Sequence, residues 1–117
     1  MRLYAHKLRE AGFTVETANS GAAALAKVNG SRTGQFDFVL TDIVTENGWR
    51  DGLELLQALK NSSNADVSLL PVVIFTGLRE AGLETQCMDL GAAGFLLKPL
   101  LVMNELRTIL TRARTLY

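Results

Sequence analysis

The sequence is short of the residues that build disulfide frameworks, metal clusters and thiol active sites. Its 117 residues include one cysteine, Cys87, and one histidine, His6. A single cysteine excludes an internal disulfide framework and is natural in a reducing compartment. Cys87 falls inside a helical pattern without the Cys or His partners of a thiol enzyme or zinc site. We therefore expect it to be a packing residue.

Charge of one sign and long apolar runs are lacking as well. The 12 basic and 12 acidic residues give a formal net charge of zero, so no basic surplus indicates nucleic-acid binding. No apolar stretch reaches the roughly 18 residues that a membrane helix needs, and no apolar signal core is seen. The sequence predicts a cytoplasmic protein, without a nucleic-acid or membrane partner, formed by one domain over residues 1–117.

What the sequence does contain is a regular alternation of helical and strand patterns. Strands are predicted at residues 13–17, 36–41, 72–75 and 94–97. Helices are predicted at residues 2–11, 22–28, 53–59, 79–90 and 103–114. Asn19 or Ser20 could cap the second helix. Strict alternation with short loops indicates an α/β protein with a parallel sheet and helices on both faces.

Three of the predicted strands are followed or ended by a residue suited to phosphate chemistry. Asp42 follows the second strand, Thr76 the third and Lys98 the fourth. In an open parallel sheet the carboxyl ends of the strands share one edge, where ligands collect. A carboxylate there can bind a hard cation or attack phosphorus, while an ammonium and a hydroxyl can hold phosphate oxygens. This set predicts reversible phosphorylation of an aspartate.

The chain resembles the receiver domain of bacterial two-component response regulators, which has a flavodoxin-like fold. The matching segments are residues 12–15, 18–25, 37–43, 51–56, 71–77 and 91–99. The resemblance implies a response regulator acting in phosphorelay signal transduction. Its partners would be a histidine kinase or phosphotransfer protein and a downstream protein partner. It implies a signalling domain and not an enzyme.

Carried over residue by residue, the resemblance implies a role for each strand-end residue. Asp42 would be the phosphoacceptor, Thr76 the switch hydroxyl and Lys98 the cation that pairs with the phosphoryl group. Phe95 would occupy the position of the aromatic switch, although a plain core aromatic is an equally good interpretation. The bond between Lys98 and Pro99 would be cis, an isomer that proline makes accessible.

The chain departs from the family at its magnesium site. Receivers begin with an apolar strand that ends in two adjacent acids, whereas this sequence begins at Met1, directly in the first predicted helix. Mg²⁺ would then depend on Asp42 and the backbone carbonyl of Val44, and we expect its binding to be weakened. Glu46 or Asp51 could replace the missing ligands. The alternative is that both are solvated loop acids, with Asp51 near a helix cap.

The missing strand is central in the family's sheet, so its loss leaves a structural gap. The neighbouring strands could pair directly, a second copy could fill the gap as a homodimer, or the sequence could start at an internal methionine. Two functions remain open. One is a phosphoacceptor whose output passes through protein contact. The other is a degenerate receiver that serves as a phosphorylation-independent binding or dimerisation module.

Overall fold

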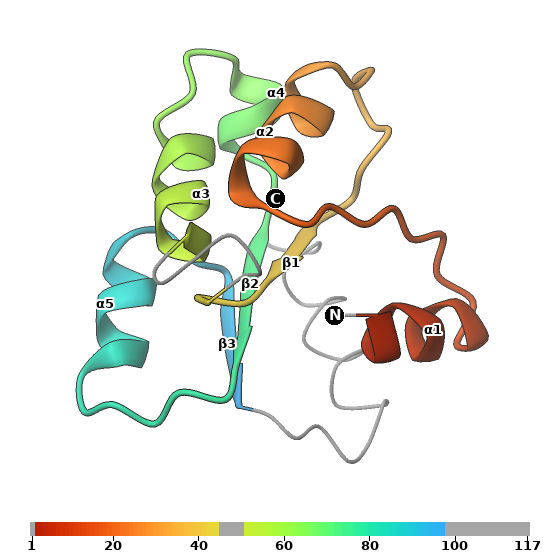
Figure 1. The fold of residues 1–117 in the computed structure, drawn as a ribbon. Coiled ribbons are helices and arrows are strands. Elements are labelled where there is room, and N and C mark those ends of the chain that lie inside the picture. Colours follow the sequence, from red (N-terminus) through yellow and green to blue (C-terminus); the bar gives the residue numbers. More distant parts are fainter. Residues whose placement is uncertain (1, 45–50, 98–117) are drawn as a thin grey trace.

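The core of the molecule is a three-stranded parallel sheet. The computed structural model describes residues 2–44 and 51–97. The strands are β1 (Val39–Thr41), β2 (Val72–Thr76) and β3 (Gly94–Leu97). They are arranged in the order β1-β2-β3, and all three run in the same direction (Figure 1). The predicted parallel α/β architecture is confirmed.

Short helices precede β1 and connect the strands, and local capping explains where several of them begin or end. The helices are α1 (Arg2–Glu10), α2 (Gly21–Asn29), α3 (Asp51–Lys60), α4 (Ala65–Ser68) and α5 (Leu83–Asp89). The Ser20 hydroxyl caps α2 by accepting the Ala23 N–H at 3.1 Å. Gly91, at φ 102°, follows the end of α5 in a backbone conformation that glycine adopts without strain.

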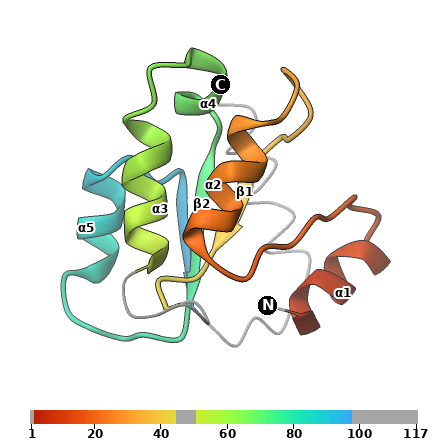
Figure 2. The same ribbon diagram turned by 45° about the horizontal axis from the view of Figure 1, so that its top comes forward.

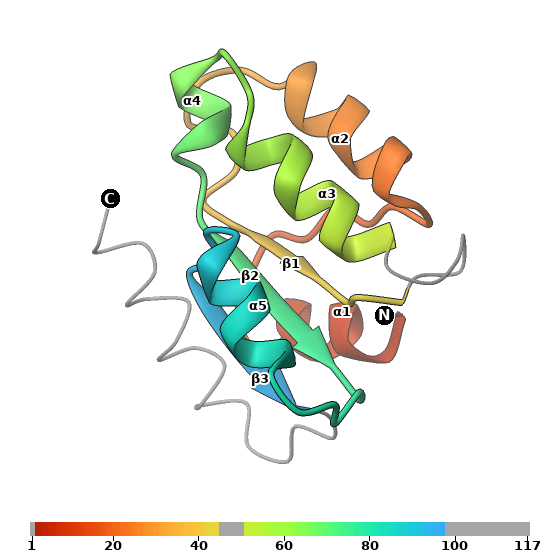
Figure 3. The ribbon, with the colours of Figure 1, turned by 90° about the vertical axis from the view of Figure 1, so that its left-hand side faces the viewer.

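Helices cover both faces of the sheet, because successive side chains of β2 point to opposite sides. Val72 and Ile74 pack in the larger core cluster, with residues of α2, α3 and α5. Val73 and Phe75 pack with Leu8 of α1 on the other face. Figure 3 shows α3 and α5 in front of the strands and α1 behind them, and Figure 2 shows α2 beside α3. All five residues of β2 are buried, as expected of a central parallel strand.

Residues 13–17, predicted as a strand, have no regular secondary structure and belong to no sheet. Among the described residues they pair with no strand, although Phe13 and Val15 pack in the same core cluster as Leu40 of β1. Two cationic side chains donate hydrogen bonds to carbonyl oxygens of segment 13–17 instead. Arg9 donates to Val15 O at 2.8 Å and Lys27 donates to Thr17 O at 2.5 Å. The predicted strand was wrong here, since strand pairing requires a neighbouring strand.

Two element starts and one helix also differ from the sequence prediction. The strand predicted from Phe36 begins only at Val39, and the helix predicted from Arg79 begins at Leu83, after Gly82 at φ 79°. Helix α4 was not predicted, because its four residues are too few to show a helical period. The helix predicted at residues 103–114 lies outside the described residues. In the part of the chain that the structure describes, no helix has the length and apolar character to cross a membrane.

Candidate functional site at the carboxyl edge of the sheet

The register of the sheet brings Asp42 and Thr76 to the same edge. Thr41, the last residue of β1, is paired with Ile74, and Asp42 follows it directly. Thr76 is the last residue of β2 and is paired with Leu97, the last residue of β3. All three strands therefore end at one edge, as the sequence predicted for the strand-end residues. Lys98 and Pro99 lie outside the described residues.

The Asp42 side chain is held over the turn that follows β1. Its Oδ1 atom accepts the Ile43 N–H at 2.7 Å and lies 3.4 Å from the Val44 nitrogen, in a longer hydrogen bond. The Thr41 hydroxyl donates to the Asp42 carbonyl oxygen at 2.9 Å. Asp42 remains partly exposed, whereas Thr41 and Ile43 are buried on either side of it. A carboxylate anchored in this way at an accessible rim has a defined direction of approach for an electrophile.

The start of α3 packs against this turn. The Gly52 N–H donates to the Ile43 carbonyl at 3.0 Å. A Cβ atom on Gly52 would overlap the Asp42 carbonyl oxygen and would lie 2.9 Å from the Ile43 Cα. Only glycine fits between α3 and the Asp42 peptide, so Gly52 belongs to the site although it carries no side chain. The Asp51-Gly52 pair before a leucine-rich helix was the available sequence signal.

Asp51 is at the start of a helix, as the alternative of an acid near a helix cap predicted, but it is buried and not solvated. It is the first residue of α3, it is 9% exposed, and its Oδ2 atom accepts the Gly21 N–H at 2.6 Å. The prediction of a solvated carboxylate failed because Gly21 lies 30 positions earlier, and only the packing of α2 against α3 brings the two together. Glu46, the other candidate ligand, lies outside the described residues.

The two predicted switch residues differ in their surroundings. Thr76 is fully buried, and its Oγ1 atom accepts the Leu78 N–H at 3.2 Å, which fixes the hydroxyl at the start of the following loop. Phe95 is paired with Ile74 in the sheet and is only partly buried, packed against the larger core cluster. Rotation of Phe95 would meet fewer contacts than movement of a fully buried ring.

The acids of this chain are a poor match to a complete magnesium site. Mg²⁺ is held by near-octahedral oxygen ligands, commonly one or two carboxylates with water and phosphate. None of the 12 acidic residues is adjacent to another in the sequence. Within residues 2–44 and 51–97, no group of three or more His, Cys, Asp or Glu side chains is placed to hold a metal. Asp42 is the carboxylate that fits such an ion, and it would leave most positions to water.

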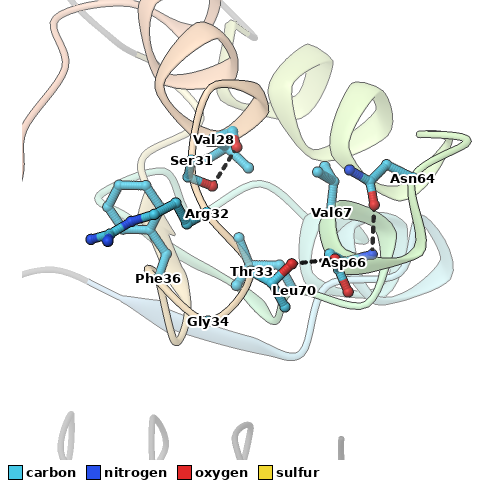
Figure 4. A pocket seen from close by; sticks show the side chains of 10 residues that line it. All are labelled: Val28, Ser31, Arg32, Thr33, Gly34, Phe36, Asn64, Asp66, Val67 and Leu70. Atoms are coloured by element: carbon cyan, nitrogen blue, oxygen red, sulfur yellow. Dashed lines mark hydrogen bonds between the residues drawn. The ribbon is translucent and has the colours of Figure 1, made fainter.

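Two hollows lie at the opposite edge of the sheet and are not part of this site. One, of about 50 Å³, lies between the loop that precedes β1 and helix α4 (Figure 4). Thr33 donates to Asp66 across it at 2.7 Å. The other, about 240 Å³ and open to solvent, is lined by residues that include Phe36 and Leu69. Both hollows are lined by residues just before β1 and β2, at the amino ends of these strands. The length of the strands therefore separates the hollows from Asp42.

Comparison with known protein families agrees with this geometry. Residues 1–111 match the response regulator receiver domain. The chain belongs to this family. Receiver domains are signalling modules of two-component systems that interact with histidine kinases and with downstream effectors. The receiver fold and the role in two-component signalling predicted from the sequence are confirmed.

Individual relatives are longer than this chain. It is 29% identical over 114 residues to the probable transcriptional regulatory protein SilR of Salmonella typhimurium, covering 93% of the chain and 45% of SilR. It is 36% identical over 93 residues to the transcriptional regulatory protein ZraR of Klebsiella oxytoca, covering 80% of the chain and 19% of ZraR. The chain thus spans less than half of these curated relatives.

A solved receiver shows the same arrangement in space. The non-phosphorylated HemR receiver domain of Leptospira biflexa superposes with a TM-score of 0.73 at 25% identity. The match covers 99% of this chain and 86% of that one. Almost all of this receiver domain therefore has a counterpart in HemR, while part of HemR has none here.

Proposed function

We propose that Asp42 of this receiver domain accepts a phosphoryl group from a histidine kinase or a phosphotransfer protein. A carboxylate oxygen of Asp42 attacks the phosphorus of a phosphohistidine, the P–N bond breaks, and the imidazole nitrogen takes up a proton. The product is an aspartyl phosphate. The observation that carries this proposal is the shared edge at which Asp42, Thr76 and the end of β3 meet.

The neighbouring residues supply the rest of the proposed switch. Lys98 follows β3 directly, so its ammonium would pair with the phosphoryl oxygens, and the Thr76 hydroxyl would turn from Leu78 N–H to the phosphoryl group. Phe95 would move with Thr76, and a cis bond before Pro99 would direct Lys98 into the site. Output would pass through contact with a downstream protein in the cytoplasm, without enzymatic activity of the domain itself.

Magnesium would serve this site weakly. Asp42 and the Val44 carbonyl would hold the ion, which would neutralise charge on the incoming phosphoryl group. With one carboxylate in place of three, we expect phosphorylation to need more Mg²⁺ than a receiver with the acidic pair. Asp51 is not a replacement ligand in this proposal, because its carboxylate is engaged with Gly21.

The test is the intact mass of the protein after incubation with acetyl phosphate, with and without Mg²⁺. We expect an adduct of one phosphoryl group that requires Mg²⁺ and is absent from Asp42→Asn. Asp37→Asn is the matched control, because Asp37 is an exposed acid that precedes the same strand by two residues. Labelling of Asp42→Asn to the level of wild type would contradict the assignment of the phosphoacceptor.

The second candidate function is a binding or dimerisation module that does not use phosphorylation. The absence of adjacent acids in this sequence favours it. In this function a homodimer would form without phosphorylation of Asp42. Sedimentation analysis distinguishes the two: a dimer without any adduct at high Mg²⁺ supports the module, and an adduct on a monomer supports the phosphoacceptor.

A further inference from the structure

We infer that Asp51 is a positioning residue for Asp42: its carboxylate ties the start of α2 to the start of α3 and thereby sets the turn that carries Asp42. The effect on phosphorylation rests on the proposed function, but the effect on geometry does not. Nothing in the sequence spacing reveals this link, because Asp51 and Gly21 are 30 positions apart.

The contact between Asp51 and Gly21 is a short hydrogen bond to a charged group. The 2.6 Å bond joins a carboxylate to a backbone N–H in a place where Asp51 is 9% exposed. The N–H belongs to the first residue of α2, and Asp51 is itself the first residue of α3. Both helix ends carry partial positive charge, which favours an anion shared between them. One carboxylate therefore fixes the relative position of two helices.

Free space is lacking on either side of the Asp51 carboxylate. A Cβ atom on Gly21 would lie 2.8 Å from Asp51 Oδ1, so the backbone of α2 approaches the carboxylate directly. Gly52, the next residue, packs its backbone against the Asp42 peptide and donates to Ile43 O. Because glycine occupies both contacts, no flexible side chain can absorb a shift of α3.

The position of α3 affects the proposed phosphoacceptor, Asp42. Oδ1 of Asp42 is oriented by the N–H groups of Ile43 and Val44, and Ile43 is the residue whose carbonyl Gly52 binds. A displacement of α3 therefore moves the same peptide groups that aim the Asp42 carboxylate. Displacement of a reacting group by about 1 Å can cost on the order of a hundredfold in rate.

The experiment compares Asp51→Ala and Asp51→Asn with Glu54→Gln in the 117-residue chain. Glu54 is the matched control, since it is the other first-turn acid of α3 and its side chain is exposed. The first readout is the NMR amide shift of Gly21, Ile43 and Val44 without phosphate. The second is the rate of adduct formation, measured at increasing acetyl phosphate to separate binding from the chemical step.

We expect Asp51→Ala to shift all three amides and to slow the saturated rate on the order of tenfold. Asp51→Asn should restore most of the rate, because its carbonyl oxygen still accepts the Gly21 N–H, and Glu54→Gln should match wild type. Unchanged Ile43 and Val44 amides in Asp51→Ala would overturn the inference, as would an equal rate.

A second variant decides the matter if Asp51→Ala does not fold. Gly21→Ala leaves the carboxylate in place but crowds it, so the Ile43 and Val44 amides should shift in the folded variant. If they do not, the link from α2 to Asp42 is refuted. If these amides shift while wild type forms no adduct, the positioning role stands and the proposed phosphoacceptor function fails.

Discussion

Gly52 lies against the carbonyl oxygen of Asp42, with no room for a side chain between them. This contact joins the first turn of α3 to the residue that follows β1. Backbone packed on backbone is a stiff contact, because neither partner has a rotamer to change.

Replacing Gly52 with alanine should destabilise the fold. The added Cβ atom forces the start of α3 away from Asp42, and overpacking of this kind costs about 1–3 kcal/mol of unfolding free energy. Urea denaturation measures the change. Gly77→Ala is the control, since a Cβ atom there has nothing within 4 Å. Equal stability of the two variants would show that the contact is soft.

The rings of Phe13 and Phe38 meet edge to face, with centroids 5.9 Å apart and planes at 69°. This contact helps to hold segment 13–17 against the residues that precede β1. A double-mutant cycle with Phe13→Leu and Phe38→Leu should give a coupling of about 0.5–1.5 kcal/mol. The control cycle pairs Phe13 with Phe36, which packs in the other core cluster, and should give a coupling near zero. Equal coupling in both cycles would argue against a specific ring contact.

Because of Lys60, the free energy of unfolding should depend on pH in the alkaline range. The Lys60 ammonium donates to the carbonyls of Ser68 at 3.0 Å and Leu70 at 2.6 Å, and burial lowers the pKa of Lys60 below its ordinary value of 10.5. Between the lowered pKa and 10.5 the unfolded state binds more protons, so the native state gains stability as the pH rises.

The variant Lys60→Met isolates this effect. At neutral pH the loss of the two hydrogen bonds should cost about 1–2 kcal/mol of unfolding free energy. The stability advantage of wild type over Lys60→Met should widen as the pH approaches 10.5. Urea titrations at neutral and alkaline pH measure it, and a narrowing advantage would contradict the stated direction.

Lys98 should be required for phosphorylation but not for folding. Lys98→Ala removes the cation that follows β3, and we expect acetyl phosphate to label it on the order of a hundredfold more slowly. Lys98→Arg keeps the charge and should lose less. Intact mass over time gives the rates, and urea denaturation checks that both variants remain folded. A Lys98→Ala rate equal to that of wild type would remove Lys98 from the site.

Labelling should respond to Mg²⁺ without saturating over the millimolar range. With Asp42 as the carboxylate available to the ion, affinity depends on one charged ligand and several waters. A titration of adduct formation against Mg²⁺ measures this, with Ca²⁺ at the same ionic strength as the control. Saturation at micromolar Mg²⁺ would reveal ligands outside the described residues.

The sequence by itself determined the local elements and the chemistry of the strand ends. Continuous apolar runs specified the sheet, with β3 predicted to the residue and β2 to within one residue, because parallel strands covered by helices on both faces have such runs. Ser20 was a foreseeable cap for α2, since a short hydroxyl side chain reaches the N–H groups of a first helical turn.

Only the tertiary structure decided which of these elements meet. Segment 13–17 has the alternation of a strand but lies outside the sheet, because strand pairing requires a neighbouring backbone that periodicity does not supply. Asp51 is the clearest case: its sequence neighbours indicate a helix start, while its burial and its bond to Gly21 arise from packing between two helices. Local sequence sets propensity and chemical type, and long-range packing sets the partner of each polar group.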